Sequence, residues 1–590
     1  MNMHWKQKGN FSTIEQVLES NTGQSIEKIL NPDHDLPIAR LRECAQAILD
    51  AIDKKSQIVI FGDYDCDGIT STAILAHTLR RFGAAPIVRL PKRFSEGYGL
   101  SETAIQDIRE GLLITVDNGV SAVEPISILR DRGVDVIVID HHLPREDGLL
   151  PNANILLDPW VTQPNGYTNW CGAGLAYRVA CEMNALRPVL SEGFLKALLS
   201  MAAIGTVADV CPLLDENRYI VKEGIRAIRQ KYAPIGFLHL IESYNIQDFS
   251  VTDIGFKIGP TINAPGRLFD DGAMQALKLI YNPDGYSRSN VEELIRINDN
   301  RKQMVSRAMD AARFAVTTED LHLQKVIVLY PKGENDYVYP EGIAGIIAGR
   351  IAEEYHLPTI VLTRGEDPDV LKGSARSYGG IHIKEALDVV NYRILRYGGH
   401  AGAAGLSVKI SEVEAFIKEL NEEIERRPAA EPPDTLYYDL EIASSELHEF
   451  CKKLSRYEPF GEGIPSPVVY VKNFVLSPRY GNTAQFGQLR LHRFPLCLAL
   501  LLRSFLRSHA FTLFLFLLGK FAQYLIEVLL QFVVSLLLLV CRFGFRKFQT
   551  LQCRYLLLGG HLLISLDLCN VDSCHVLAPF ALFGDLPPRF

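Results

Sequence analysis

Acidic and histidine side chains follow four apolar, strand-like runs in the first 210 residues, where they could bind metal ions. The clusters are Asp63-Tyr64-Asp65-Cys66-Asp67-Gly68, Asp117-Asn118-Gly119, Asp140-His141-His142 and Asp209. In a parallel α/β sheet, ligands bind in the crevice beyond the carboxyl ends of the strands, so these side chains are expected to converge. Converging carboxylates are unfavourable unless cations neutralise them. The pattern therefore predicts a divalent metal site, for two ions.

Each cluster taken alone has a simpler interpretation. Asp-Gly after a strand is common turn chemistry, and a His-His pair can serve as a cap. The joint pattern favours the metal site, because three Asp at alternate positions lie on one side of the chain if it stays extended there. Carboxylates and imidazoles suit Mn²⁺ or Mg²⁺, and Cys66 is expected to point away from the ions.

The elements that must position these clusters alternate between strands and helices. Strands are predicted at 58–63, 86–90, 112–117 and 134–140, helices at 71–82, 102–111 and 122–132, and a further strand-like run at 201–208. Helices dominate from 174 to about 315, with a long charged helix at 296–314. A second α/β unit runs from 326 to about 425, a Pro-rich linker covers 427–433, and a third unit has a strand at 436–440, a helix at 445–455 and a strand at 468–476.

Further motifs make the chain similar to a known family. The Asp-Tyr-Asp-x-Asp-Gly and Asp-His-His motifs resemble those of the DHH phosphoesterases. Additional motifs narrow the resemblance to the RecJ family of bacterial single-strand-specific 5′→3′ DNA exonucleases, and they lie at 96–100, 259–267, 342–346, 372–377, 398–405 and 458–463. The resemblance runs in order from about residue 35 to about residue 484. One departure is Pro340, which stands where the family carries His.

The resemblance implies roles for individual residues. The metal ligands would be Asp65, Asp67, Asp117, His141 and Asp209, with Asp117 between the two ions. Asp63 would either bind a metal ion itself or support the residues that do. His142 would contact the scissile phosphate and not the metal. The sequence alone does not decide the roles of these two residues. The substrate would contact Tyr98, Arg267, Ser374, Arg376, Gly399 and His400, with Phe94 as a second candidate for stacking. A surface Arg at 267 and a tight turn at 398–400 are the simpler alternatives.

The resemblance also implies an architecture of two α/β lobes joined by helices. It consists of an N-terminal extension (1–35), a DHH domain with a parallel sheet (36–230), a helical connector (231–325), a smaller DHH-associated substrate-binding domain (326–426) and a partial OB-fold-like unit (433–484). A length of 590 residues is consistent with three or four domains.

The composition of the chain bears on its surface charge and on the cellular compartment in which it works. The net charge of −8 excludes a generally basic surface, but it leaves room for a local basic groove. The 11 Cys show no CxxC pair and no zinc spacing, which favours a reducing compartment. The first residues show no signal-like apolar stretch, so a cytoplasmic protein is expected.

Residues 485–590 differ in character from the rest of the chain. They hold 30 Leu and 14 Phe, and only four acids against ten Lys and Arg. A membrane anchor needs about 20 apolar residues, and the best candidate, 526–541, contains Glu527 and Gln531. A folded domain should show clear periodicity, which is absent. Translation in another frame fits best, so we expect an aberrant tail, an incomplete OB-fold, and little loss of activity on truncation near residue 430.

The expected function is metal-dependent degradation of single-stranded DNA from the 5′ end, in DNA repair and recombination. The expected protein is a monomer without membrane contact that works with a helicase and a single-strand binding protein. Two alternatives stay open. A DHH hydrolase of short oligonucleotides or cyclic dinucleotides would usually be shorter and lack the third unit. A non-catalytic scaffold relative would show eroded ligands, whereas the expected ligands are all present.

Overall fold

The computed structural model describes residues 4–97, 99–282, 285, 288–334, 336–365, 367–427, 435–472, 551–558 and 561–568. The chain divides into two units, Met1–Val475 and Leu476–Phe590. In the second unit, strands β15 (Leu551–Leu558) and β16 (His561–Leu568) pair antiparallel. The expectation of an out-of-frame tail otherwise falls outside the described residues. Among the described residues, every helix is too short or too polar to span a membrane.

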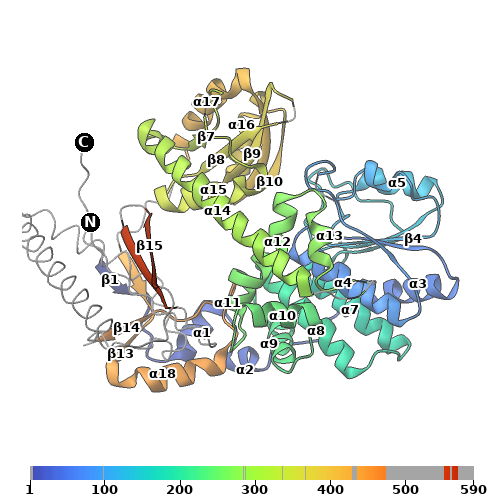
Figure 1. Ribbon diagram of the computed structural model, residues 1–590. Coiled ribbons are helices and arrows are strands. Elements are labelled where there is room, and N and C mark those ends of the chain that lie inside the picture. The colour runs from blue at the N-terminus through green and yellow to red at the C-terminus, as the bar shows by residue number, and fades with distance from the viewer. Residues whose placement is uncertain are drawn as a thin grey trace, which may run out of the picture. The chain divides into compact units, whose positions relative to one another are not determined.

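The first lobe is built on a five-stranded parallel sheet in the order β3-β2-β4-β5-β6 (Figure 1). Its strands are β2 (Ile58–Phe61), β3 (Ile87–Arg89), β4 (Leu112–Val116), β5 (Asp135–Ile139) and β6 (Ile155–Leu157). Both faces are buried, because alternate residues of β2 join different cores: Ile58 and Ile60 pack in one, and Val59 and Phe61 in the other. This explains the continuous apolar runs and confirms the α/β fold.

Helices cover the two faces of this sheet. One face carries α3 (Leu41–Asp53), α4 (Cys66–Arg81) and α7 (Gly172–Leu186), whose apolar residues share a core with Ile58 and Ile60. The other face carries α5 (Val123–Asp131) and the short η1 (Thr103–Ile105). Cys66 is buried in the first core, and among the described residues it belongs to no group that could hold a metal ion, as expected.

Three sequence expectations about these elements were wrong. The helix expected at 102–111 is reduced to η1, because the Arg132 guanidinium takes up the carbonyls of Ile105 and Ile108 (2.8 and 3.3 Å). The strand-like run 201–208 is the second half of helix α8 (Glu192–Ala208), since periodicity does not separate a buried helix from a buried strand. Helix α4 starts at Cys66 instead of residue 71, because Asp65 caps it.

Helices α8 and α9 (Asp215–Arg229) pack in the core of the first lobe. The helices that follow connect this lobe to the second: α10 (Ile235–Ser243), α11 (Val251–Asp253), α12 (Gly259–Leu268), α13 (Gly272–Leu277) and α14 (Arg288–Thr318). The long charged helix expected at 296–314 lies within α14.

The second lobe has a mixed five-stranded sheet in the order β10-β11-β9-β8-β7. Its strands are β7 (Ile327–Leu329), β8 (Thr359–Arg364), β9 (Val370–Arg376), β10 (Arg396–His400) and β11 (Ala403–Lys409). Its helices are α15 (Glu341–Tyr355), α16 (Ile383–Val389) and α17 (Val413–Glu425). The β7–β8 pair is parallel and the remaining pairs are antiparallel.

The third unit is assembled together with the N-terminal residues. Strand β12 (Thr435–Tyr438) pairs in parallel with β1 (His4–Gln7), and β13 (Leu440–Ala443) pairs with β14 (Val469–Lys472). The helices are α1 (Ile14–Thr22), α2 (Ile26–Leu30) and α18 (Leu447–Leu454).

A buried arginine joins this unit to the first lobe. The Arg218 guanidinium, on α9, donates to the carbonyls of Ile29 (2.6 Å), Pro459 (2.7 Å) and Tyr457 (2.7 Å). Leu440 and Tyr457 also belong to the main core of the first lobe. Residues 4–30 and 435–464 are therefore part of the first lobe's packing, and a cut near residue 430 would remove core contacts.

Candidate metal centre

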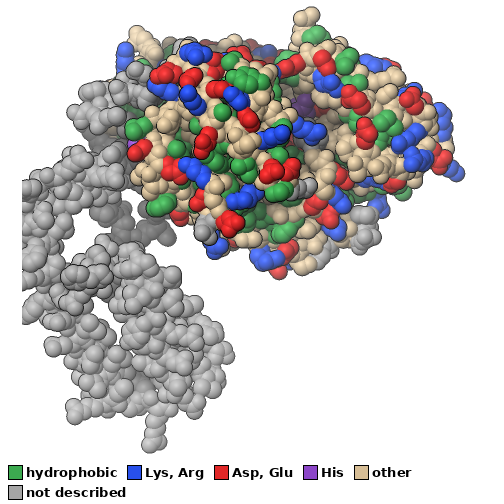
Figure 2. Space-filling view, turned by 90° about the horizontal axis from the view of Figure 1, so that it is seen from above, with side chains coloured by type: hydrophobic (Ala, Val, Ile, Leu, Met, Phe, Trp, Pro, Cys, Tyr) green, Lys and Arg blue, Asp and Glu red, His purple; other side chains and the backbone are tan. Residues whose placement is uncertain are grey.

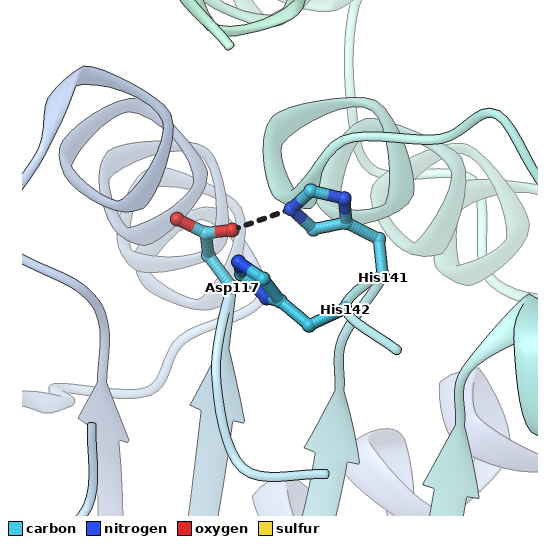
Figure 3. A group of neighbouring side chains, drawn as sticks. All are labelled: Asp117, His141 and His142. Carbon is cyan, nitrogen blue, oxygen red and sulfur yellow. Dashed lines mark hydrogen bonds and ion pairs between the residues drawn. The ribbon is translucent and has the colours of Figure 1, made fainter. Parts of the chain in front are cut away.

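The carboxyl ends of three adjacent strands deliver the acidic and histidine side chains to one place. Asp63 follows β2, Asp117 follows β4, and the Asp-His-His sequence follows β5. Backbone hydrogen bonds hold the strand ends in register, with Asp117 N–H donating to Ile139 O at 3.0 Å. Figure 3 shows Asp117, His141 and His142 converging just beyond the ends of the strands. The convergence expected from a parallel sheet is present.

Asp65 and Asp67 reach the same place by a different route from the one expected. The Asp65 carboxylate accepts hydrogen bonds from the Asp67 and Gly68 amides (3.0 and 3.1 Å), so it caps α4. Asp67 then lies in the first helical turn, and the chain is not extended there. The prediction that three alternate residues share one side of an extended segment was wrong; the helix start brings the carboxylates together instead.

The start of a second helix holds the Asp67 carboxylate. Its oxygens accept hydrogen bonds from the amides of Gly172 (2.6 Å) and Ala173 (2.9 Å), at the N-terminus of α7. Gly172 is required here, because a Cβ at this position would lie 2.6 Å from the Asp117 Cβ. Helix N-termini commonly hold carboxylates in this way, so α7 fixes the position of the Asp67 side chain.

His141 lies at the centre of the group. Its Nε2 is 2.9 Å from Asp117 Oδ1 and 3.7 Å from Asp67 Oδ2, and its Nδ1 is 4.0 Å from Asp209 Oδ2. Three overlapping triads have ligand atoms within 4.8 Å of one another: Asp117-His141-His142, Asp67-His141-Asp209 and Asp63-Asp65-Asp117. All seven predicted metal and catalytic residues are thus brought together.

The electrostatics of the group favour a cation. Burial, followed by the neighbouring carboxylates, raises the pKa of Asp117 well above its usual range, and the same two causes raise the pKa of Asp63. They also raise the pKa of Asp209 to about 8. Oδ1 of Asp63 is buried and has no hydrogen-bond partner among the described residues. Divalent cations bound by oxygen and imidazole ligands fit these residues.

Asp140 is a residue for which the sequence suggested no separate role. Its Oδ1 lies 2.8 Å from His142 Nδ1 and accepts the His141 amide at 2.8 Å, while Oδ2 accepts the Val120 amide at 2.8 Å. Burial opposes a charge on His142, but the hydrogen bond to Asp140 and the nearby carboxylates outweigh it and raise the pKa of His142 to about 9. Asp140 therefore fixes the orientation of His142 and keeps it protonated.

Arginines border the acidic group. Arg267, on α12, is half-buried, and its partial desolvation, together with the neighbouring Arg93 and Arg301, lowers the pKa of Arg267 to about 10, while Asp65 opposes that change. Arg93 lies over the Tyr64 ring, 4.8 Å from its centroid. Sequence reasoning identified Arg267 but not Arg93 or Arg301. Guanidinium groups beside a metal site suit the recognition of a phosphate.

The second lobe brings together four of the remaining predicted residues. Ser374 and Arg376 lie two apart on β9, and β11 separates them from Gly399 and His400 on β10, whose partners are Ala404 and Ala403. Gly399 has a φ of 151°, and a Cβ there would lie 2.2 Å from Ala403 O, so the hairpin needs glycine. The Arg376 guanidinium packs against α15, where a Cβ on Gly345 would meet its Nη2 at 2.7 Å. Tyr98 lies outside the described residues.

Comparison with known proteins agrees with these motifs. Residues 57–206 match the DHH family, N-terminal domain, and residues 323–426 match the DHHA1 domain. The single-stranded-DNA-specific exonuclease RecJ of Haemophilus influenzae is 32% identical over 470 residues, covering 75% of this chain and 79% of the relative. The chain belongs to the RecJ family.

Other RecJ proteins extend the comparison. The Bacillus subtilis RecJ is 34% identical over 449 residues, and this chain spans about half of its length, 54%. The structure of RecJ from Thermus thermophilus in complex with Mn²⁺ matches with a TM-score of 0.68 and 28% identity, over 80% of this chain and 70% of that one. A structure of RecJ bound to manganese matches with a TM-score of 0.57 at 32% identity, over 67% of this chain and 96% of that one.

The departure from the RecJ pattern at residue 340 lies at the start of α15. Pro340 precedes the helix and gives it no side-chain cap, while Glu341 pairs with Lys372 of β9 at 2.8 Å. Gly342 packs directly on the connector, since a Cβ there would lie 1.8 Å from Arg267 O. The helix start thus keeps its contact with Arg267 without an imidazole at residue 340.

Proposed function

We propose that this RecJ-family chain is a metal-dependent exonuclease that degrades single-stranded DNA from the 5′ end. The observation that carries the proposal is the set of three overlapping carboxylate and imidazole triads at the ends of β2, β4 and β5. Asp65, Asp67, Asp117, His141 and Asp209 would hold two Mn²⁺ or Mg²⁺ ions. When bound, the ions would activate a water molecule and neutralise charge that develops on the phosphate.

Two residues would act beside the ligands. His142 is protonated near neutral pH because Asp140 raises its pKa, and its side chain is 41% exposed, so it would donate a hydrogen bond to the scissile phosphate. Asp63 would complete the site, since its buried Oδ1 has no hydrogen-bond partner among the described residues.

The basic residues would grip the substrate. Arg267 borders the metal centre and contacts the second lobe through Gly342 O (3.4 Å). In that lobe, Ser374 and Arg376 lie on β9, and Gly399 and His400 lie on β10, with β11 between the two strands. Phosphates of a single strand would lie along these groups, with the 5′ end held there, which gives the 5′→3′ direction. Tyr98 would stack on a base.

The proposal also includes the domain boundaries, the cellular location and the partners of the protein. Residues 36–230 would form the DHH domain, 231–325 the connector, 326–426 the substrate-binding domain and 433–484 a partial OB-fold-like unit, with 1–35 as the N-terminal extension. We infer a cytoplasmic monomer that works in DNA repair and recombination with a helicase and a single-strand binding protein.

The test uses short single strands labelled at either end. With Mn²⁺, the wild-type protein should release mononucleotides from the 5′ end, EDTA should stop the reaction, and a cyclic dinucleotide should not be hydrolysed. Asp117→Asn should lower kcat by more than about 100-fold, because loss of a ligand costs more than loss of a group that only supports one. Without metal, it should melt no lower than wild type, since a buried repelling carboxylate is removed. Release from the 3′ end, or turnover within tenfold of wild type, would refute the proposal.

A further inference from the structure

One ion pair joins the loop beyond the metal centre to the second lobe. Glu146 lies in the loop between β5 and β6, four residues after His142, and its Oε1 is 2.8 Å from Lys384 Nζ on α16. The second oxygen, Oε2, accepts from the same Nζ at 2.9 Å. Among the ion pairs of the described residues, this one connects the sheet domain of the first lobe directly to the second lobe.

The loop is built to present Glu146. Arg145 pairs with Glu124 of α5 (3.1 Å) and with Asp147 (2.7 Å), and Asp147 accepts the Leu149 amide at 3.0 Å. These contacts fold the loop on itself and tie its base to α5. The Glu146 side chain is left 80% exposed, so its position depends on Lys384 and not on burial.

Lys384, the other partner of the ion pair, lies on a helix that is bonded to the hairpin of the proposed substrate-binding residues. Lys384 is in the first turn of α16 and also pairs with Asp388 at 3.1 Å. The Ile383 amide donates to Ala401 O at 3.0 Å, in the turn that follows His400. A movement of α16 would therefore move the β10–β11 hairpin, where Gly399 and His400 lie.

The second lobe also contacts the helical connector, at a separate place. There, Gly342 at the start of α15 packs on Arg267 of α12. The view from above in Figure 2 shows a recess in which a His side chain is visible, with Lys and Arg side chains beside it. The second lobe is thus held at Glu146, four residues after His142, and again at Arg267, which lies beside the acidic group.

We propose that Glu146 and Lys384 form a latch that encloses the substrate, so that a strand must enter by a free end. The inference rests on the proposed nuclease function and names the residues that set its requirement for an end. With the latch closed, a circular single strand has no route to the metal centre. With the latch open, an internal segment enters from the side.

The chemistry of the latch makes it reversible. An exposed ion pair contributes little to stability, and salt screens it, so thermal motion opens and closes it. Reversing one charge replaces attraction with repulsion and holds the latch open. Reversing both charges restores the attraction, which gives a test that does not depend on either side chain alone.

The experiment measures how unlabelled circular single-stranded DNA inhibits hydrolysis of a short 5′-labelled oligonucleotide with Mn²⁺. Glu146→Lys and Lys384→Glu should each make the circle at least threefold more inhibitory, and the double exchange should return inhibition to the wild-type level. High salt should shift wild type towards the single variants. The control is Asp53→Lys, which reverses an exposed carboxylate paired with Arg187 within the first lobe, and which should change nothing.

The outcomes separate the latch from the nuclease. If wild type fails to cleave the linear oligonucleotide, the proposed function is wrong. If wild type and variants cleave it but the circle inhibits all of them equally, the latch is wrong. If circular DNA inhibits the double exchange as strongly as it inhibits the single variants, the effect arises from the charge near the metal centre, and the latch is again wrong.

Discussion

At the scale of single residues, the centre depends on a glycine as much as on its carboxylates. Gly172 donates its amide to Asp67 and leaves space for Asp117, whose backbone adopts a φ of 63°. Such a conformation is uncommon outside glycine, though Asp tolerates it better than most residues. The close approach of α7 to β4 therefore positions two predicted ligands at once.

A Gly172→Ala substitution should therefore weaken metal binding without changing any ligand. The added Cβ would lie 2.6 Å from the Asp117 Cβ and 3.0 Å from its Oδ1, so the start of α7 or Asp117 must shift. We expect at least about tenfold weaker Mn²⁺ binding by calorimetry, the range for a group that supports a ligand. Gly255→Ala is the matched control, since a Cβ there has nothing within 4 Å. Equal Mn²⁺ affinity in the two variants would contradict the role of Gly172.

The raised pKa of Asp209 predicts how pH affects the metal-free protein. The pKa is 3.8 in the unfolded chain and about 8 in the fold, so the folded state binds the extra proton. The stability that this proton gives is fully present below pH 3.8 and is lost as the pH rises through about 8. In EDTA, the melting temperature should fall as the pH rises from about 6 to about 8. With Mn²⁺ the trend should reverse, because the ion replaces protons. The same trend with and without Mn²⁺ would disprove this account.

At the scale of elements, β9 carries Ser374 and Arg376, two of the residues proposed to bind the substrate. Arg376→Ala should weaken binding of a short single strand by about 1–3 kcal/mol, the range for a charge-assisted contact, with Mn²⁺ affinity unchanged. Arg364→Ala, on the neighbouring strand β8, is the control because Arg364 donates to Gly333 O on the surface. Lower metal affinity with unchanged DNA affinity would contradict the division of work between the lobes.

The sequence predicts those parts of the centre that local pattern determines. Asp117 and the Asp-His-His motif are predictable because they end buried parallel strands, and the sheet itself places them side by side. The sequence correctly groups Asp209 with the other ligands, but it predicts a strand before Asp209 where the structure has a helix. The apolar run there has no period that would distinguish a helix from a strand. Its helix, α8, is recognised only once its packing is known.

Tertiary contacts account for what the sequence does not show. Asp67 is held by amides 105 and 106 residues further along the chain, and no local signal marks Gly172 and Ala173 as its partners. The same applies to Arg93 and Arg301, which approach Arg267 from different elements. Family resemblance supplies ligand identities, whereas the groups that orient them emerge from the fold.

At the scale of the whole molecule, the third unit contributes to the packing of the first lobe. A truncation after residue 475 should keep the first unit intact, whereas one after residue 430 should not. The shorter form loses two of the three carbonyls that bind the buried Arg218. At about 1.5–3 kcal/mol for each hydrogen bond to a charged group, it should be destabilised by at least about 3 kcal/mol. The sequence-based expectation that a cut near residue 430 costs little activity stays a prediction, but the shorter form should be the less stable of the two. Urea unfolding of both forms is the measurement, and equal midpoints would contradict the predicted loss of stability.

The pairing of the two ends of this unit also affects its synthesis. β1 begins at His4, and its partner strand begins at Thr435. At about 5–20 residues per second, a ribosome needs roughly 20–90 s to make the intervening chain. During that time β1 has no partner strand, and the carbonyls of Tyr457 and Pro459 that accept hydrogen bonds from Arg218 have not yet been synthesised. The nascent chain therefore has an unpaired strand, and an arginine without two of its backbone partners, through most of translation. The packing of the metal-binding lobe is completed only when the third unit leaves the ribosome.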